Sequence, residues 1–457
     1  MAGHNLTAGP IRRHVMRMGI VVLIGVIVQN LYGIIDLYWV GHLGTESVAA
    51  VALANNVLLA VLATTQMLAV GTSALVAQAS GRQDRTEVAR LFNQSMLVGV
   101  AVGALLTLSL FLLRREYSDW LAGDARTSAL TQQFLAWFAP AMFLQFVMVV
   151  LASALRGIGD VRSAALAQVG TVVLNMILAP LLIFGVITGR PAGVTGAAVA
   201  TLISVAVGAL FLFGYVIRRK RHFSFRPAAW VPDLALWWQV MRIGLPSALE
   251  FGIMALSFGF VMAVIQPFGP AAQAAFGVGM RILQFGVAAC MAFSFAAAAV
   301  IGQNYGARSE ERVRAAFRAV LMINLLISAV FVALVQLAPQ RVLGWFSQGD
   351  EEMIRIGAEL LRILGWNVVA TGVAVACNAV FSGLGNTLPS LASSATRLML
   401  IVGSVLWLRD HAQFQLRWIW QISLVAMVVQ ASINLFFVRR QLAERFGAGA
   451  AVQTVLR

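Results

Sequence analysis

Charged side chains are scarce in this sequence. Only 11% of its 457 residues are Asp, Glu, Lys or Arg, whereas 60% are hydrophobic and the mean hydropathy is +0.85. A soluble globular domain typically has about 25% charged residues and about 45 to 50% apolar ones. The shortage of charge therefore excludes an ordinary soluble domain and indicates an integral membrane protein.

Cysteine and histidine are also rare. Cys290 and Cys377 lie inside apolar stretches, where small buried side chains are a better interpretation than a disulfide or redox pair. The five histidines fall at termini and in loops without the spacing of metal ligands. We therefore expect no metal and no cofactor. No nucleophile, base and orienting group can be assembled from the intramembrane polar residues, so an enzyme is not expected.

Apolar stretches long enough to cross a membrane recur along the whole chain. A helix needs about 20 mostly apolar residues to span about 30 Å of hydrocarbon. Gly, Ala, Ser and Thr are scattered through these stretches, as expected where helices pack closely in lipid. Twelve stretches are predicted to be transmembrane helices: 15–40, 48–78, 91–113, 130–155, 163–187, 193–217, 239–266, 273–302, 316–337, 357–382, 388–408 and 416–437.

Basic residues are distributed unevenly between the two sides of the predicted bundle. Twelve crossings put both termini on one side, and the segments on that side hold 22 Lys and Arg against 9 in the opposite loops. The positive-inside rule therefore predicts that both termini are cytoplasmic. The tract RRKRHFSFR at 218–226 belongs to a loop on that side. We interpret it as a topology or lipid-headgroup element and expect no nucleic-acid partner.

The two halves of the sequence repeat each other. MRMG at 16–19 recurs as MRIG at 241–244, an offset of 225 residues, and RGIGD at 156–160 returns as SGLGN at 382–386. Matches at one fixed offset indicate an internal repeat. The ungapped offset also pairs Gly44 with Gly269, Ala49 with Ala274, Ala50 with Ala275, Gln78 with Gln303, and Gly81 with Gly306.

The even number of helices in each copy determines the predicted architecture. Six crossings return the chain to its starting side, so both copies enter the membrane in the same orientation. We predict an all-α integral membrane protein with twelve transmembrane helices in two six-helix lobes, related by a pseudo-two-fold axis along the membrane normal. The predicted boundaries are 1–220 for the first lobe, 221–240 for a cytoplasmic linker and 241–457 for the second lobe.

Several of these motifs resemble a known family. GIIDLYWVGHLGTESVAAVALA (33–54), GLPSALEFG (244–252), the RGIGD and SGLGN turns, and VAQASGRQD with its echo IGQNYGARS are similar to segments of the multidrug and toxic compound extrusion (MATE) family. The resemblance covers essentially the whole chain. It implies a bacterial inner-membrane antiporter that exports organic, often cationic and amphipathic compounds. Such export would be driven by inward movement of protons or sodium ions, and we expect protons.

Asp36 lies near the end of the first predicted helix. Acids within membrane spans are costly and mostly mark ion or substrate routes. In the DinF-like branch that this sequence resembles, the helix-one Asp adjoins an Asn and an Asp of helix five and a Thr of helix six, which correspond here to Asn175, Ala179 and Thr201. Because the second acid is missing, the resemblance favours one proton over a sodium ion. The alternatives are helix capping by Asp36 and ordinary interhelical hydrogen bonds for Asn175 and Thr201.

Glu250 raises the same question in the second lobe. It follows Pro246 by four residues, and the NorM-like branch resembles this sequence in using a helix-seven Glu for cation coupling. That branch also has an acid deep in helix ten, which this sequence lacks. Three roles stay open for Glu250: a buried ion pair with Arg281 or Arg397, a second proton site, or attraction of a cationic substrate.

Methionine and aromatic side chains are the candidates for a substrate cavity. Their soft surfaces suit promiscuous recognition of flat, apolar cations. Packing in the core or against lipid is the alternative for each of them. The candidates are Met67, Met254, Phe258, Met262, Met280, Phe285 and Met291.

Two other membrane functions compete with export. A flippase for a lipid-linked precursor would share the two-lobed fold, but its cavity should carry several basic residues, whereas only Arg281 and Arg397 lie within predicted spans. An ion channel would need a ring-forming filter element, and the sequence shows none. We therefore expect a monomeric exporter of small organic cations or drugs, with membrane lipids as its other partners.

Overall fold

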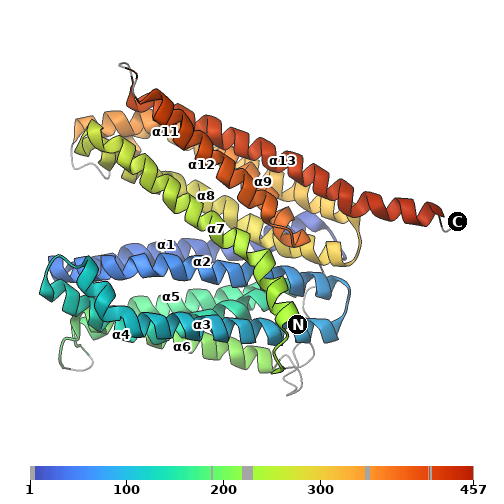
Figure 1. The fold of residues 1–457 in the computed structure, drawn as a ribbon, viewed down its shortest axis with the longest axis horizontal. Helices are drawn as coiled ribbons and strands as arrows, with labels where there is room; N and C mark the ends of the chain where they lie inside the picture. The colour runs from blue at the N-terminus through green and yellow to red at the C-terminus, as the bar shows by residue number, and fades with distance from the viewer. Residues whose placement is uncertain are drawn as a thin grey trace. The chain divides into compact units, whose positions relative to one another are not determined.

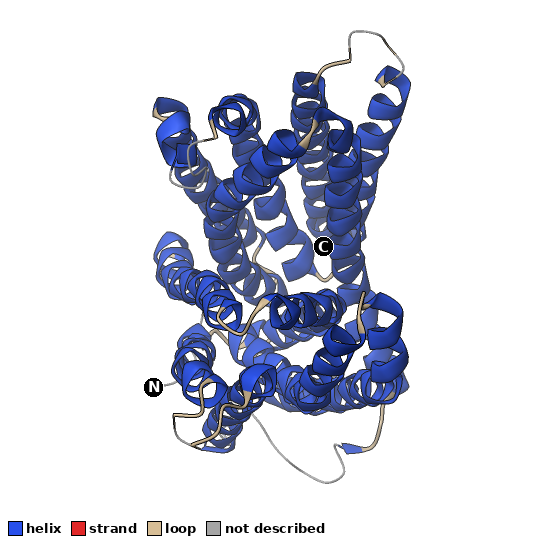
Figure 2. Ribbon diagram, turned by 90° about the vertical axis from the view of Figure 1, so that its left-hand side faces the viewer, coloured by secondary structure: helices blue, strands red, loops and turns tan. Residues whose placement is uncertain are grey.

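Long helices make up the protein. The computed structural model describes residues 6–186, 189–218, 230–344, 350–409, 411 and 414–455, of which the side chains of 32–34, 36, 37 and 447–455 are left out. The described residues contain no strand (Figure 2). Twelve of their helices are long and apolar enough to cross a membrane, which confirms the predicted all-α membrane protein with twelve spans.

The helices are named in chain order (Figure 1). They are α1 (Ile11–Gly41), α2 (Thr45–Gly81), α3 (Arg85–Leu121), α4 (Ala125–Gly157), α5 (Val161–Ile183), α6 (Gly193–Arg218), α7 (Leu234–Ile265), η2 (Gln266–Phe268), α8 (Pro270–Gly306), α9 (Glu310–Leu337), α10 (Pro339–Gly344), α11 (Glu351–Leu384), α12 (Leu388–Leu408) and α13 (Leu416–Val455). Helix α10 has only six residues and is the one α-helix among these too short to span.

Aspartates begin several of the helices. A side-chain oxygen just before a helix accepts a hydrogen bond from an otherwise unpaired backbone N–H of the first turn. The aspartates that cap helices in this way are Asp84 for α3, Asp124 for α4, Asp160 for α5 and Asp350 for α11. Half of the eight aspartates in the sequence therefore serve helix ends rather than membrane-embedded positions.

The internal repeat extends to the backbone conformation. Residues with positive φ are uncommon outside glycine. Three pairs of such residues recur at offsets of 225 or 226: Gly44 (97°) with Gly269 (93°), Gln83 (61°) with Arg308 (56°), and Gly159 (85°) with Gly385 (73°). The first pair of turns precedes α2 and α8, and the second pair follows the same two helices. The third pair follows α4 and α11. Turns of the same conformation at equivalent positions support a repeat of the backbone structure and not merely a similar composition of the two halves.

The chain divides into two compact units whose boundaries differ from the predicted lobes. Unit 1 contains Ile24–Leu245, and unit 2 contains Leu6–Leu23 together with Pro246–Arg457. The start of α1 therefore belongs to unit 2, and the start of α7 belongs to unit 1. The predicted boundaries placed all of α1 in the first lobe and α7 from residue 241 onward in the second, because a repeat shows which residues correspond and not which residues they contact. Residues 221–229 of the predicted linker lie outside the described residues.

Each unit is built around one central helix. In unit 1, α4 packs against α2, α3, α5 and α6. In unit 2, α11 packs against α8, α9, α10 and α13, and more briefly against α12. These two helices are the fourth span of each half and end in the RGIGD and SGLGN turns.

Leu6, which precedes α1, is held by residues of unit 2. Leu6 is fully buried, its backbone N–H donates to the Gln303 side chain at 3.2 Å, and its carbonyl accepts from Asn304 at 3.1 Å and from Arg312 at 3.2 Å. The segment before α7 is fastened to unit 1 in a similar way. Gln94 donates to the Val231 carbonyl at 2.7 Å.

Asp233 completes the attachment of α7 and gives a pH-dependent prediction. Its carboxylate accepts from the backbone N–H of Leu236 at 3.1 Å and pairs with Arg90 at 2.6 Å. The Leu236 hydrogen bond, followed by that of Arg90, lowers the pKa of Asp233 below its ordinary value. Ionised Asp233 therefore stabilises the fold above its ordinary pKa of about 4, and this contribution is lost as the pH falls through the lower folded value.

We expect Asp233→Asn to unfold at a lower temperature than the wild type at pH 7. The difference should shrink below about pH 4 as the wild-type carboxylate becomes protonated. Thermal unfolding in detergent between pH 7 and pH 3 measures this. A difference that stays constant across the whole range would show that the charge contributes nothing.

Candidate functional site

A buried cluster of polar side chains surrounds Glu250 in unit 2. Glu250 lies on α7, one turn beyond Pro246, and is half-buried. Its carboxylate accepts hydrogen bonds from the Ser390 hydroxyl at 2.7 Å, the Ser394 hydroxyl at 2.9 Å and the Asn378 amide at 3.3 Å. The donors come from α12 and α11. Three neutral donors therefore hold this acid within the apolar part of the unit.

Helix periodicity explains why α12 supplies two of these donors. Positions four residues apart lie on the same face of a helix. Ser390 and Ser394 have this spacing, and both are almost completely buried. Leu388 and Pro389 begin the helix just before them. The PSLASS stretch thus presents two hydroxyls to one point on α7.

Two amide groups extend the cluster and leave oxygens unpaired. Gln430 of α13 donates to the Ser394 hydroxyl at 2.8 Å. The buried side-chain oxygens of Gln430 and Asn378 have no hydrogen-bond partner among the described residues. A buried acceptor without a donor is costly unless a proton, water or ion fills the gap. The cluster thus has unused acceptor capacity next to a carboxylate.

Arg397 lies close to this cluster without forming an ion pair. It is attracted electrostatically by Glu250, yet within the described part of the chain no arginine lies within the 4 Å of Glu250 that defines a salt bridge. One of its terminal nitrogens lies 3.4 Å from the Met427 sulfur, and its buried Nε has no partner among the described residues. Arg281 of α8 is exposed and likewise makes no hydrogen bond or ion pair there. The groups that hydrogen-bond to the Glu250 carboxylate are therefore neutral donors and not arginines.

The predicted site of the first lobe is described only in part. Asn175 of α5 is buried and donates to the Thr201 hydroxyl of α6 at 3.0 Å, and Thr201 in turn donates to the Ala197 carbonyl at 3.1 Å. The Asn175 side-chain oxygen has no partner among the described residues. Asp36 is on α1, but its side chain lies outside the described residues. Its role stays a prediction.

The two acids are not equivalents of each other in the repeat. At the offset of 225, Glu250 corresponds to Gly25 and Asp36 corresponds to Val261. Glu250 and its partners are therefore a feature of one half of the chain only.

The candidate cavity residues differ in exposure. Met67 is buried within unit 1 at 6% exposure, which places it in that unit's core packing. Met254, Phe258 and Phe285 are exposed, at 52%, 42% and 56%. Phe258 also stacks on Phe276 with ring centres 5.3 Å apart. The remaining candidates, Met262, Met280 and Met291, are half-buried.

Sequence reasoning missed Ser390, Ser394, Asn378 and Gln430. The family resemblance pointed to an acid in the helix that contains Asn378, and Arg281 and Arg397 were the predicted partners of Glu250. The available signal was a run of small polar residues in an apolar span, since such residues commonly hydrogen-bond between membrane helices. Among the described residues, no group of three or more His, Cys, Asp and Glu side chains could hold a metal ion.

Comparison with known proteins gives consistent matches over almost the whole chain. The family profile described as MatE matches residues 22–181 and 246–407. The probable multidrug resistance protein NorM of Thermotoga maritima is 26% identical over 83% of this chain and 82% of its own length. The FAD transporter of Shewanella oneidensis is 27% identical over 87% of this chain and 88% of its own length.

Solved structures match equally broadly. A MOP superfamily transporter from Pyrococcus furiosus, described as having a binding pocket of reverse polarity, superposes with a TM-score of 0.88 at 27% identity. The match covers 97% of this chain and 99% of that one. A MATE structure in the bent conformation gives a TM-score of 0.91 at 26% identity, over 98% of this chain and 99% of that one.

Proposed function

Because this chain belongs to the MatE family of membrane transporters, we propose that it exports organic, cationic and amphipathic compounds by alternating access, driven by protons that bind at Glu250. Members of this family are transporters and not enzymes. The observation that carries the proposal is the Glu250 carboxylate, held by three neutral donors. An ion pair would fix this acid in its ionised form, whereas neutral donors leave it free to bind a proton.

The partners of Glu250 suit both protonation states. A serine hydroxyl donates to an ionised carboxylate and can rotate to accept from a protonated one. The Asn378 amide donates now, and a half-turn would offer its unpaired oxygen instead. Protonation therefore needs only local rotations of these side chains.

Protonation at this point would act on α7. Hydrogen bonds to an ionised group are roughly twice as strong as those between neutral groups. The bonds of Glu250 tie α7 to α11 and α12. Neutralising the acid weakens this attachment, so proton binding can bias the position of α7. That bias is the link between ion entry and alternating access.

Asp36 is proposed as a second proton site in the first half of the chain. Its expected neighbours Asn175 and Thr201 are hydrogen-bonded to each other, and the unpaired oxygen of Asn175 would accept a hydrogen bond from a protonated acid. Ala179 is buried at the position of the missing second acid. A single carboxylate supports the choice of a proton over sodium. The membrane proposed is the bacterial inner membrane, with both termini cytoplasmic.

Ethidium transport in reconstituted vesicles tests the coupling ion. We expect an imposed proton gradient to drive transport and a sodium gradient alone to leave it at background. The unpaired oxygens of Asn378 and Gln430 are also potential sodium ligands, since hard cations prefer oxygen. Transport driven by sodium alone would replace the proton with a sodium ion at the same cluster. Absence of ethidium transport under both gradients would contradict export of organic cations.

An anionic cargo is the second candidate. Arg281 is exposed within α8 and has no ion-pair partner in the described part of the chain, and one relative is named an FAD transporter. A planar compound with phosphate groups would suit a free guanidinium. The same vesicles should show competition by FAD if this alternative holds, and Arg281→Gln should remove that competition. Competition by further organic cations instead supports the main proposal.

A further inference from the structure

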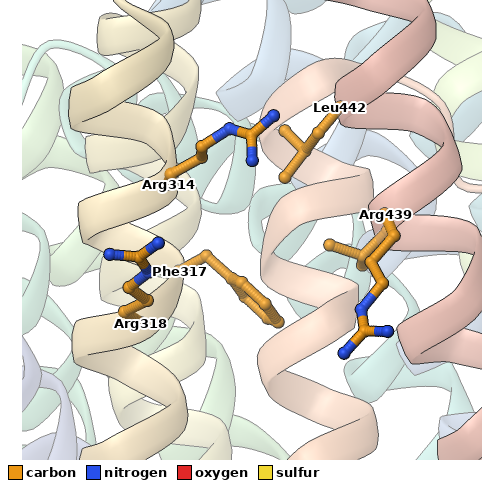
Figure 3. A pocket seen from close by; sticks show the side chains of 6 residues that line it. Arg314, Phe317, Arg318, Arg439 and Leu442 are labelled. Atoms are coloured by element: carbon orange, nitrogen blue, oxygen red, sulfur yellow. The ribbon is translucent and has the colours of Figure 1, made fainter.

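A groove lies between α9 and α13 in unit 2 (Figure 3). Its volume is about 290 Å³, and its lining consists of Arg314, Phe317 and Arg318 from α9 and Val438, Arg439 and Leu442 from α13. Both helices pack against α11 but make little contact with each other. The groove is therefore a gap between neighbouring helices of one unit and is independent of the Glu250 cluster.

The charge of the groove is mostly uncompensated. Arg314 pairs with Glu310 at 2.6 Å. Arg318 and Arg439 make no ion pair or hydrogen bond with the residues that the structure describes. The acid nearest in sequence to Arg439, Glu444, is already paired with Arg440 at 2.7 Å. The groove therefore has three guanidinium groups and one carboxylate, that of Glu310. Its net positive charge attracts an anion.

Apolar side chains lie between the arginines. Figure 3 shows Phe317 directed from α9 toward α13, with Arg314 and Arg439 reaching from the two helices on either side of it. Val438 is 1% exposed and Leu442 is 5% exposed, so the floor of the groove is closed and hydrophobic. A small hydrated anion gains nothing from such a floor. An amphiphile with an anionic head and a hydrocarbon chain can interact favourably with both the arginines and the apolar floor.

The position along the helices fits the headgroup region of a membrane. Arg314 and Arg318 lie four and eight residues after the first residue of α9, which is about 6 and 12 Å along the axis at 1.5 Å per residue. Arginines at this depth extend their charged ends toward the membrane surface while their stems stay in apolar surroundings. This end of α9 is also the side with the excess of basic residues in the sequence.

We propose that this groove binds an anionic phospholipid, with its phosphate among Arg314, Arg318 and Arg439 and an acyl chain against Phe317, Val438 and Leu442. Basic pockets between transmembrane helices on the cytoplasmic side are known to suit cardiolipin-type headgroups. The lipid bridges α9 and α13 where the protein itself leaves them apart. This site goes beyond the proposed export function and does not depend on it.

Native mass spectrometry of the purified full-length protein tests the site. We expect cardiolipin to stay bound to the wild type, and the Arg318→Gln/Arg439→Gln variant to bind it roughly twenty-fivefold more weakly, at about fivefold per arginine near an anionic headgroup. Arg440→Gln is the matched control, because Arg440 neighbours the groove on α13 but is paired with Glu444. It should retain wild-type binding.

Two further probes separate the possible ligands. Phosphatidylethanolamine should bind much more weakly than cardiolipin, and inorganic phosphate should not displace cardiolipin. Equal retention of cardiolipin by the double variant and the control would overturn the proposal. So would equal binding of the two lipids, or displacement by phosphate alone, which would indicate a simple ion site. Circular dichroism of both variants shows whether they are folded, and Phe317→Ala gives a second test through the apolar floor.

Discussion

Vesicles that contain the Glu250→Gln variant are expected to show no gradient-driven ethidium transport above the level of protein-free vesicles. Glutamine has nearly the same shape as glutamate. Its carbonyl oxygen can accept from one of the two serines, Ser390 or Ser394, and its amide can donate to the hydroxyl of the other once that hydroxyl rotates, so the fold should survive. It cannot take up and release a proton. The change therefore removes coupling while leaving the cluster in place, and transport with the wild-type protein in parallel measures it.

A matched control separates coupling from general damage. Glu359→Gln changes an exposed acid on α11 that pairs with Arg417 at 3.6 Å, and this variant should transport normally because exposed ion pairs contribute little. Ethidium binding to the Glu250→Gln variant in detergent should persist. Normal transport by Glu250→Gln would contradict a coupling role for this acid. Asp36→Asn would then become the decisive variant.

The second large effect is expected from Gly244→Val. Gly244 lies near the start of α7, where a Cβ atom would meet the backbone carbonyl of Met67 on α2. A backbone carbonyl cannot rotate away as a side chain can. Overpacking of this kind typically costs about 1 to 3 kcal/mol, and a β-branched residue against backbone falls at the upper end or beyond. The variant should lose monodisperse protein at a temperature several degrees below the wild type.

Gly259→Val provides the comparison for this prediction. Gly259 is on the same helix, but a Cβ atom there would meet nothing within 4 Å. Both substitutions carry the same intrinsic cost in a helix, so the difference between them isolates the contact with α2. Size-exclusion chromatography after heating measures both. Equal midpoints for the two variants would show that α7 can withdraw from α2 without loss of stability.

Hydropathy predicted the spans well. It also predicted the ends of α12 (388–408), but it placed several other helix ends too far inside. The predicted helix 91–113 became α3, Arg85–Leu121, because hydropathy detects the lipid-embedded part while the helix continues beyond it. The repeat was visible in the sequence, and the backbone turns at Gly44 and Gly269 follow it. Helix ends depend on caps such as Asp84, which carry no hydropathy signal.

The acid of the site, Glu250, could be predicted from the sequence, but its hydrogen-bond partners could not. Glu250 stands out because a charge is expensive in an apolar helix. Ser390 and Ser394 look ordinary by themselves, since serines occur throughout the spans. They become a site because α12 brings them to α7, and this depends on contacts among helices separated by more than 100 residues along the chain. No local sequence pattern indicates that these distant helices are in contact.

The burial of Leu6 in unit 2 has a consequence for synthesis of the protein. The ribosome adds Leu6 to the chain roughly 300 residues before the side chains of Gln303, Asn304 and Arg312 that hold it. At about 5 to 20 residues per second, the first segment waits tens of seconds for its partners. A fusion placed directly before Leu6 would have to tolerate that delay and then leave the segment free to dock. Leu6 is thus translated long before the side chains that hold it and reaches its final contacts late.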